Sequence, residues 1–527
     1  MTSNWQLPYP SQRQPVFARN AVATSQPLAA QAGLRMLLQG GNAVDAALAS
    51  AIALTVVEPS GCGIGSDAFA IVWDGEKLHG INGSGRAPAA WTAERFAGND
   101  RMPVIGWESV TVPGSVSAWV ELSKRFGALP FAKVFEPAVE YARGGFQLGP
   151  LTARHYLQAS KVYRDFAAFS EHFLPGGHVP KPGEVVFYGD TADTLESIAA
   201  TEGVSFYRGA LAEKMATAAA RVGGGLTEDD LAAHEAQWVD PIAVPYRDVV
   251  VHEIPPNGQG LTALIALGIL QNRDIAQYPV DSADSVHLQV EAVKLAWAEA
   301  SAHIADVDHM VQATSTFLDP LLHRHLAEMI DMREARDRAS VVPASDDTVY
   351  LSTADASGMM VSMIQSNFRG FGSGCVVPET GIHMHNRGSG FSLIDGHPNQ
   401  VGPSKRPFHT IIPGFSTRDG MADMSFGVMG GHMQAQGHVQ LIVRCEDYGQ
   451  NPQAASDAPR FHMREDGVLM LEAGFGDAVV AELRSRGHDV LVAPPGNPFG
   501  GAQLIRCMPV GYCAASDHRK EGLAVGY

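Results

Sequence analysis

A threonine that follows a charged linker is the first residue of this sequence that could do chemistry. Thr348 comes after residues 330–347, a charged stretch with one proline, and the next residues, VYLSTA, alternate with a period of two that indicates a strand. A threonine hydroxyl is a weak nucleophile until a base lies beside it. If the chain is cut between Asp347 and Thr348, the freed α-amino group can be that base, because its reference pKa is about 8.

A hairpin is the simpler interpretation of the same residues. Ala356-Ser357-Gly358 can turn the chain, and MMVSMIQSN then returns as a second strand. Threonine favours strands whether or not it reacts. The local pattern alone therefore favours a Thr348 that only begins a strand, and the catalytic interpretation needs support from elsewhere in the chain.

A glycine pair later in the chain could stabilise an oxyanion. Gly430 and Gly431 precede HMQAQGHVQLIVRCEDYG, a run that indicates a helix. Glycines let backbone N–H groups approach a ligand closely, and a helix N-terminus favours negative charge. These are features of an oxyanion hole at an acyl-transfer centre. A plain turn before a helix is the commoner reason for such a pair.

Several motifs in order resemble the γ-glutamyltransferase family of N-terminal-nucleophile hydrolases, which are made as proenzymes. Around and after Thr348 the matching runs are DTVYLSTADASG, SNFRGFGSG, ETGIHMHN, GPSKRP, MGGH, DAPRFH and ASDHR. Upstream, GGNAVDAALASAIALTVVEPSGCGIG resembles the opening of the family's large subunit. The resemblance spans nearly the whole chain.

The resemblance implies an α+β fold, a four-layer αββα sandwich shared by two subunits cut from one precursor. Residues 1–347 would form the large subunit and residues 348–527 the small one. Thr348 would be the nucleophile, and Gly430 and Gly431 the oxyanion donors. Ser366 keeps a hydroxyl where the family has a second threonine, so its implied role is to orient the nucleophile and assist self-cleavage. No cofactor is implied.

The departures from the family pattern concern the substrate. Family members hold the α-amino group of a glutamyl donor with an asparagine, a glutamine and an aspartate. The matching positions here are Phe368, Arg387 and Gly390. An acid has been lost and a cation gained, and an ammonium group would be repelled there. The catalytic residues are therefore present without the residues that recognise the glutamyl group.

The expected substrate carries a carboxylate and lacks an α-ammonium group. Two serines that hold the donor carboxylate in the family are replaced by His409 and Thr410, and the family's arginine aligns near Ser84, with Arg86 two residues further on. With Arg387, these side chains can bind a carboxylate through charge-assisted hydrogen bonds. Phe368 adds bulk, which favours a short substrate. Oxamate fits, and the chain also resembles the oxamate amidohydrolases of bacterial purine breakdown.

Other interpretations stay open. A glutathione hydrolase or a cephalosporin-type acylase is the first alternative, and an inactive binding protein is the second. Arg387 by itself would favour the interpretation as a surface arginine in a salt bridge, as would Arg369. A serine α/β-hydrolase would need a G-x-S-x-G elbow, which the sequence lacks. His383 and His385 could face one side of a strand, but no third ligand stands at a typical spacing, so no metal site is predicted.

Composition and charge narrow the class of protein. The chain has 527 residues, 45% of them hydrophobic, and a net charge of −18 without any basic run. This argues against nucleic acid and anionic membrane as partners, but not against a small anionic substrate. The N-terminal twenty residues lack an apolar export segment, and the five cysteines are not arranged in pairs. We expect a cytoplasmic enzyme, with a homodimer of the processed heterodimer left open.

Periodicity predicts the elements that must position these residues. Ala43–Val57 is too short to span a membrane and indicates a buried helix capped by Asn42. AFAIVWD indicates a strand, and residues 110–330 are expected to be mostly helical. Helices are also expected after Gly431 and over residues 477–486. Residues 61–65, GCGIG, do not follow a strand, so they are not interpreted as a nucleotide-binding loop.

Overall fold

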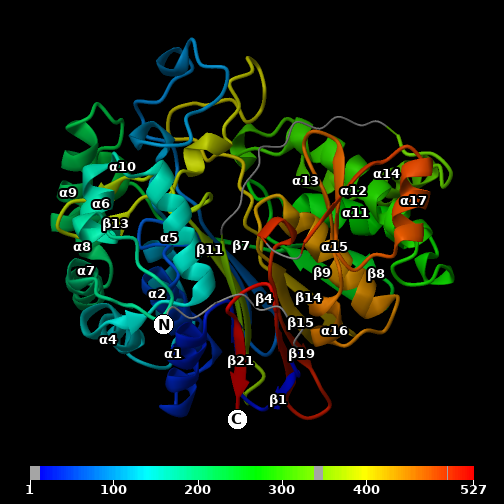
Figure 1. The fold of residues 1–527 in the computed structure, drawn as a ribbon, viewed down its shortest axis with the longest axis horizontal. Coiled ribbons are helices and arrows are strands. Elements are labelled where there is room, and N and C mark those ends of the chain that lie inside the picture. Colours follow the sequence, from blue (N-terminus) through cyan, green and yellow to red (C-terminus); the bar gives the residue numbers. More distant parts are fainter. Residues whose placement is uncertain (1–11, 337–347, 495–496) are drawn as a thin grey trace.

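Two stacked sheets with helices on both outer faces make up the protein (Figure 1). The structure is a computed structural model that describes residues 12–336, 348–494 and 497–527. Asp347, on the predicted cleavage side of Thr348, lies outside these residues. The first residue described after the gap is therefore Thr348 itself.

Each sheet has seven strands, and consecutive strands that pair as hairpins lie beside strands from distant parts of the chain. The first sheet has the order β1 (Val16–Ala18), β20 (Tyr512–Ser516), β19 (Ala502–Cys507), β15 (Met421–Val428), β14 (Gly414–Arg418), β9 (Val249–Glu253) and β8 (Ile242–Tyr246). The second has the order β21 (Leu523–Gly526), β2 (Ala21–Thr24), β10 (Val349–Ala354), β11 (Met360–Ser366), β3 (Asp67–Trp73), β4 (Leu78–Gly83) and β7 (Gln237–Val239). Small additional sheets contain β5 (Phe146–Gln147) with β6 (Val185–Val186), β12 (Val376–Val377) with β13 (Ile382–His383), and β16 (Phe461–Met463) with β17 (Val468–Glu472) and β18 (Asp489–Ala493).

The helices form the two outer layers. The side drawn in blue, cyan and green in Figure 1 contains α1 (Pro27–Leu38), α2 (Ala43–Val57), α3 (Ser115–Phe126), α4 (Glu136–Gly144), α5 (Pro150–Val162), α6 (Ala167–Phe173), α7 (Gly189–Ala200), α8 (Val204–Arg208), α9 (Ala210–Ala220) and α10 (Glu228–Ala232). The other side contains α11 (Gly260–Gln271), α12 (Ala283–His303), α13 (Thr314–Phe317), α14 (Pro320–Glu328), α15 (Met433–Glu446), α16 (Pro452–Asp457) and α17 (Asp477–Ser485). The predicted four-layer αββα architecture is confirmed.

The side chains of β10 are buried on both faces of its sheet. Tyr350 joins an apolar cluster between the two sheets, with Phe69 of β3 and Phe415 of β14. Val349 and Leu351 point the other way and pack in the cluster that contains α2. Because successive side chains of a strand face opposite sides, the sequence VYLSTA supplies both layers at once.

Helix α2 forms as its sequence predicts. Asn42 caps it by accepting hydrogen bonds from Val44 N and Asp45 N, and the Asp45 carboxylate accepts one from Asn42 N. All residues of the helix are buried, which accounts for the absence of a polar stripe. Residues 110–330 are indeed largely helical, but they also supply β7, β8 and β9. Strands β7 and β8 lie at sheet edges and β9 lies next to β8, and all three have only three to five residues, too few for a clear period-two pattern in the sequence.

Within the described residues, no helix combines the length and the apolar character needed to cross a membrane.

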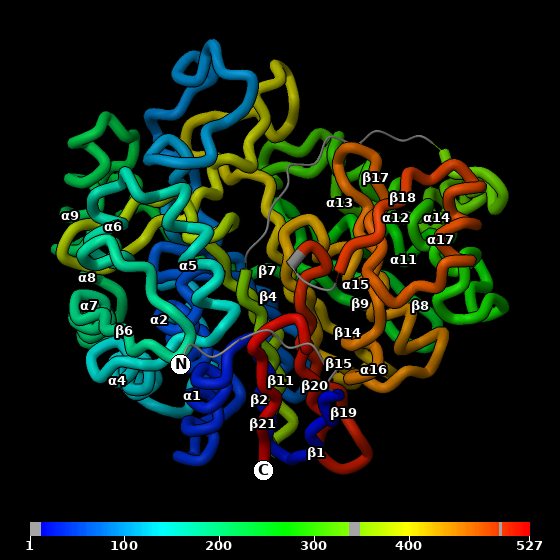
Figure 2. Tube along the Cα trace, viewed as in Figure 1, coloured from blue at the N-terminus to red at the C-terminus, as the bar shows by residue number. Residues whose placement is uncertain are grey.

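The sheets interleave strands from both sides of the predicted cleavage point. Strands β10 and β11 lie between β2 and β3, and the C-terminal β21 pairs with β2, as Figure 2 shows in red beside blue. The first sheet likewise joins β14 to β9. Separating the two pieces would break backbone hydrogen bonds in both sheets and expose their apolar faces.

We therefore expect the two pieces of a chain cut before Thr348 to stay associated. They should elute together from a native size-exclusion column, at the position of the uncut Thr348→Ala variant, and separate on a denaturing gel. Dissociation of the pieces in dilute buffer without denaturant would contradict this arrangement.

Candidate active site

Strand pairing places Thr348 beside Ser366. In the β10–β11 ladder Val349 pairs with Gln365, so Thr348, one residue earlier, lies opposite Ser366. Their hydroxyl oxygens are 3.0 Å apart, and either can donate. The Ser366 oxygen also accepts a hydrogen bond from Phe368 N at 2.8 Å. Thr348 is 1% exposed. The predicted nucleophile and its predicted orienting hydroxyl are thus in direct contact.

The glycine-rich loop after α2 packs against the start of β10. A Cβ on Gly61 would lie 2.8 Å from a Val349 methyl carbon and 3.3 Å from the Thr348 carbonyl carbon. A Cβ on Gly63 would lie 2.2 Å from the His383 ring. A side chain at Gly61 would collide with the start of β10, and one at Gly63 would collide with the His383 ring. The loop that resembles a nucleotide-binding sequence therefore serves to enclose Thr348.

The glycine pair forms a tight turn between β15 and α15. Gly430 has φ 111° and Gly431 has φ 58°, values that favour glycine. Their carbonyl oxygens accept hydrogen bonds from Met433 N and Gln434 N at the start of the helix. Within the described chain, neither glycine N–H group has a hydrogen-bond partner. Two backbone donors are thus available at this turn.

A glutamine that sequence reasoning missed fixes the turn. The Gln259 side-chain amide donates to Gly431 O at 2.8 Å and to Thr410 O. It therefore ties the glycine turn to the segment that leads into β14. The only sequence signal for this residue is its place just before α11, in a loop marked by proline and glycine.

Arg387 is a buried cation with an unused edge. Its side chain is 0% exposed, and Nη1 donates to Thr410 Oγ1 at 2.8 Å. The guanidinium lies over the Phe368 ring, with 4.2 Å from Cζ to the ring centroid. Among the described residues, Nε and Nη2 have no hydrogen-bond partner. This excludes the interpretation of Arg387 as a surface arginine in a salt bridge.

Asp67, at the start of β3, is a second residue that sequence reasoning missed. Its Oδ1 accepts hydrogen bonds from the N–H groups of Gly85 and Gly114 at 3.2 and 3.1 Å. Its Oδ2 lies 3.0 Å from His409 Nε2. Since His409 Nδ1 accepts from Ile411 N at 3.4 Å, Nε2 carries the ring proton and donates to Asp67.

The electrostatics of this cluster are set by burial. Burial raises the pKa of Asp67 to about 7, although Arg387 and the two backbone N–H groups oppose the shift. Burial lowers the pKa of Arg387 to about 9, with Asp67 opposing, so the guanidinium is still charged at neutral pH. Burial and Arg387 lower the pKa of His385 to about 3 and that of His409 well below its usual range. Both imidazoles are therefore neutral.

The remaining predicted binding residues lie as follows. His409 and Thr410 hold Asp67 and Arg387, respectively, so in this structure they support the charged pair. Arg86 is paired with Asp306 at 2.9 Å, is about one-third exposed, and lines a cleft of about 340 Å³ with Arg406 and His234. Its ion pairs are with Asp306 and Asp308, and its other hydrogen bond goes to Ser404 O. A direct role for Arg86 with substrate stays a prediction.

Neither of the two histidines considered for a metal is arranged for one. His383 Nε2 lies 3.1 Å from the Asn367 amide nitrogen and 3.0 Å from Pro59 O, and His385 faces Asp67. In the part of the chain that is described, the one group with suitable ligand spacing is His287, Glu291 and His488.

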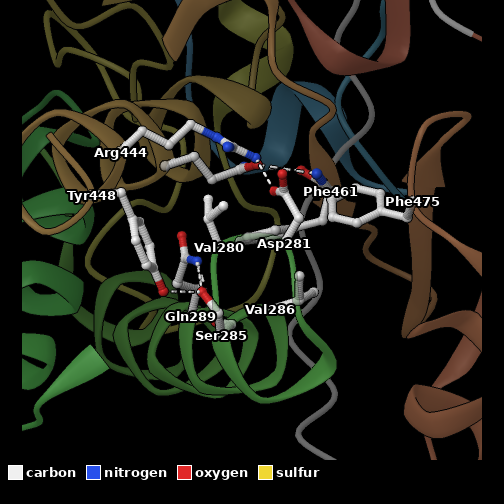
Figure 3. A pocket seen from close by; sticks show the side chains of 10 residues that line it. Val280, Asp281, Ser285, Val286, Gln289, Arg444, Tyr448, Phe461 and Phe475 are labelled. Carbon is white, nitrogen blue, oxygen red and sulfur yellow. Dashed lines mark hydrogen bonds and ion pairs between the residues drawn. The ribbon is translucent and has the colours of Figure 1, made fainter. Parts of the chain in front are cut away.

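The side chains of that group already bind one another or a neighbouring lysine. His287 bonds to His488 at 2.8 Å, and Glu291 pairs with the Lys294 ammonium at 2.9 Å. A lysine therefore supplies the positive charge there. A separate small cavity beside Arg444 and Asp281 (Figure 3) has a volume of about 10 Å³, roughly one water.

Comparison with known proteins decides the family. The sequence model described as gamma-glutamyltranspeptidase matches residues 29–527. The chain belongs to the gamma-glutamyltranspeptidase family. It is similar to the glutathione hydrolase-like YwrD proenzyme of Bacillus subtilis, with 35% identity over 97% of this chain and 99% of that protein. It is also similar to the oxamate amidohydrolase proenzyme of Klebsiella pneumoniae, with 36% identity over 95% and 97%.

A solved structure gives the same fold. The crystal structure of cephalosporin acylase from Bacillus halodurans has a TM-score of 0.95 and 43% identity, and covers 100% of this chain and 99% of that one. This gamma-glutamyltranspeptidase-family protein is therefore a hydrolase of C–N bonds with an N-terminal-nucleophile hydrolase fold. The curated relatives are named proenzymes, which implies processed large and small subunits.

We expect self-cleavage before Thr348. Its hydroxyl would attack the preceding carbonyl carbon, the peptide would rearrange to an ester, and water would open that ester. The small fragment should then begin Thr-Val-Tyr-Leu, as read by N-terminal sequencing. Thr348→Ala should remain one full-length chain, whereas Thr348→Ser, which keeps a hydroxyl, should still cleave. Cleaved and active Thr348→Ala protein would remove Thr348 from this role.

A side chain at the glycine turn should impair turnover. In Gly431→Val, strained backbone and added bulk should displace a donor and lower kcat on the order of 100-fold or more. Gly449→Val is the matched control, because Gly449 has nearly the same φ, 60°, on an exposed turn. The measurement is kcat on folded and cleaved protein. Equal turnover in both variants would place the oxyanion donors elsewhere.

Proposed function

We propose that this protein is a self-processing N-terminal-threonine amidohydrolase that hydrolyses a small carboxylate-bearing amide. Oxamate, cleaved to oxalate and ammonia, is the first candidate. The proposal assigns residues 348–527 to a small subunit whose Thr348 is the nucleophile, and residues 1–347 to the large subunit. Arg387 is assigned to the substrate carboxylate.

The unused edge of Arg387 carries the proposal. Nε and Nη2 form one side of the guanidinium, and this side matches the two oxygens of a carboxylate in a bidentate pair. A buried donor without a partner costs about 1–3 kcal/mol, and more when it is charged. Such donors are therefore expected to face a ligand. Thr410 holds the opposite side of the guanidinium, which fixes its orientation.

Phe368 argues for a short acyl group. Its ring lies against the guanidinium, and its backbone has φ 77°, which is unusual for a bulky residue. Ser366 Oγ accepts from the Phe368 N–H, so the strained residue is held next to the hydroxyl that contacts Thr348. Phe368, which contacts Arg387, and Ser366, which contacts Thr348, are thus only two residues apart in the chain. This short separation favours a substrate whose amide and carboxylate groups are close together.

The charge of the pocket disfavours a γ-glutamyl donor. The α-ammonium group of such a donor would approach Arg387, a buried cation. Asp67 is the nearby acid, but both of its oxygens already accept hydrogen bonds from the protein. An ammonium group would thus meet repulsion without a compensating partner.

The proposed reaction follows from these positions. The freed α-amino group of Thr348 takes the hydroxyl proton as Oγ1 attacks the amide carbonyl. The N–H groups of Gly430 and Gly431 stabilise the oxyanion, and Ser366 orients Oγ1. The amine returns the proton to the leaving ammonia. Water then attacks the Thr348 ester with the amine again as base, which releases the acid and restores the enzyme.

An acylase for larger substrates is the second candidate. It is favoured by the TM-score of 0.95 and 43% identity with the cephalosporin acylase of Bacillus halodurans. The cleft that contains Arg86 and Arg406, about 340 Å³, is large enough for a longer acyl group. A glutathione hydrolase is a further alternative. Any measurable turnover would exclude an inactive binding protein.

The wider setting belongs to the same proposal. Oxamate hydrolysis would place the enzyme in the nitrogen metabolism of purine breakdown. A cytoplasmic location fits the five cysteines, all of which are free thiols. A homodimer of the processed heterodimer remains a prediction.

Oxamate and glutathione should separate the candidates. We expect kcat/KM to be far higher for oxamate, measured as ammonia release, than for glutathione. Removing one partner of a shielded charged pair costs roughly 2–5 kcal/mol, so Arg387→Ala should lower kcat/KM for oxamate by about 30-fold or more. Self-cleavage should survive, because Arg387 is not needed for the acyl shift.

Arg86→Ala serves as the comparison for Arg387→Ala. If Arg387 holds the carboxylate, Arg86→Ala should change kcat/KM for oxamate much less. A better rate with glutathione, or unchanged oxamate turnover in Arg387→Ala, would contradict the proposed substrate class. A larger loss in Arg86→Ala would move the carboxylate site to the cleft.

A further inference from the structure

We propose that Asp67 is the counter-ion of Arg387 in the empty site and that it takes up a proton when a substrate carboxylate binds. The inference rests on the proposed function, because it assumes that the unused edge of Arg387 receives a carboxylate. It adds a residue that none of the sequence motifs indicated, and it makes substrate binding dependent on pH in a stated direction.

Asp67 is fully enclosed. It is 0% exposed, as are His385, His409 and Arg387 around it. His385 Nε2 lies 3.7 Å from Oδ1, and His409 Nε2 lies 3.0 Å from Oδ2. In the β3–β11 ladder Asp67 pairs with Ser366, so it lies one strand away from the hydroxyl that contacts Thr348. The carboxyl group is thus built into the site rather than exposed at its edge.

Binding of a substrate carboxylate would change the net charge of the buried site. With Asp67 ionised, Arg387 and Asp67 are together neutral. A second carboxylate on Arg387 would give the Arg387–Asp67 pair a net negative charge away from water, which is costly even though Arg406 also acts on Asp67. A proton on Asp67 restores neutrality. Two carboxyl groups that compete for one cation should therefore bind one proton between them.

Neighbouring groups do not compete for this proton near neutral pH. The charged and titratable groups that act on Asp67 or on its neighbours are His385, His409, Arg387, Arg406, His234 and Tyr207. The pKa values of His385 and His234 are lowered to about 3 by burial, and that of His409 is also lowered well below its usual range. Burial lowers the pKa of Arg406 to about 10, and burial raises that of Tyr207. Asp67, with a pKa raised to about 7, is the group that titrates.

The structure offers a place for the proton. A proton on Asp67 Oδ2 can be donated to His409 Nε2 if the imidazole carries its own proton on Nδ1 instead. The present partner of Nδ1 is Ile411 N at 3.4 Å, so this tautomer loses a long hydrogen bond and leaves two N–H donors facing each other, a cost that opposes the shift. His409 stays neutral throughout, and Oδ1 keeps its two backbone donors.

The sign of the pH effect follows. Binding favours protonated Asp67, so affinity is highest below its pKa and falls as pH rises through about 7. For one linked proton, the apparent dissociation constant of a carboxylate should rise about tenfold between pH 6 and pH 8. A rival role for Asp67, as a partner for a substrate ammonium group, predicts the opposite trend for amine-bearing ligands.

Calorimetry on the processed wild-type enzyme tests the inference directly. Acetate, oxalate, malonate and glutarate are titrated at pH 6 and pH 8, each in two buffers of different ionisation enthalpy. For the carboxylate that binds, uptake should approach one proton at pH 8 and be much smaller at pH 6. Asp67→Asn should abolish the uptake and the pH slope.

A second carboxyl group provides the matched control. Burial also raises the pKa of Glu465 to about 7, in a site whose charged neighbours are Arg369, Asp466, Arg464 and Arg101. Glu465→Gln should leave proton uptake unchanged. The role of Asp67 is overturned, while the proposed function stands, if carboxylate binding needs Arg387 but takes up no proton. The same holds if proton uptake is lost only in Glu465→Gln. If no carboxylate binds, or binding survives in Arg387→Ala, the proposed function fails as well.

Should Asp67→Asn fail to fold or mature, the wild-type measurement still decides the matter. Absence of proton uptake at pH 8 would overturn the proposal without any variant.

Discussion

The register of three neighbouring strands determines where the chemistry can occur. Thr348 lies opposite Ser366, and Ser366 pairs with Asp67, so the three residues form a row across β10, β11 and β3. Residues directly opposite in antiparallel strands point to the same face. That face is the layer between the sheets, since Tyr350 and Phe69, two positions along their strands, pack there. A slip of one residue would turn each side chain to the helical side.

The first sheet, which contains β14 and β15, faces the site from across that layer. The segment before β14 brings His409 and Thr410, and the turn after β15 brings Gly430 and Gly431. Gln259 ties these two segments together. In the proposed reaction, the nucleophile and its neighbouring hydroxyl thus come from one sheet and the oxyanion donors from the turn after β15 of the other, while Arg387 lies in the short helix Arg387–Gly390. The sandwich must be packed correctly before the site exists, which links folding to self-processing in a proenzyme.

Sequence predicted the local features well and the long-range ones poorly. The bounds and cap of α2, the hairpin after Thr348 and the helix after Gly431 follow from periodicity and turn residues. The resemblance to the family had already implied that Ser366 orients Thr348. Asp67 was missed because a single aspartate at the start of an apolar strand carries no motif, and its partner His409 is 342 residues away. Strands β7 to β9 were missed because each has only three to five residues, and β7 and β8 lie at sheet edges.

We propose that substrate recognition in this protein rests on charge. A buried guanidinium needs compensation, and Asp67 supplies it when the site is empty. The same cation that excludes an ammonium group can attract a carboxylate, so the loss of the family's glutamyl-binding residues need not mean loss of activity. The central claim is that one small amide is held by Arg387 while Thr348 attacks it.

Rapid-quench mass spectrometry of the small fragment during oxamate turnover tests that claim most directly. The account predicts an oxalyl ester on Thr348, which forms readily in wild type and much more slowly in Arg387→Ala. An adduct on another residue, or equal ester formation in both proteins, would contradict it.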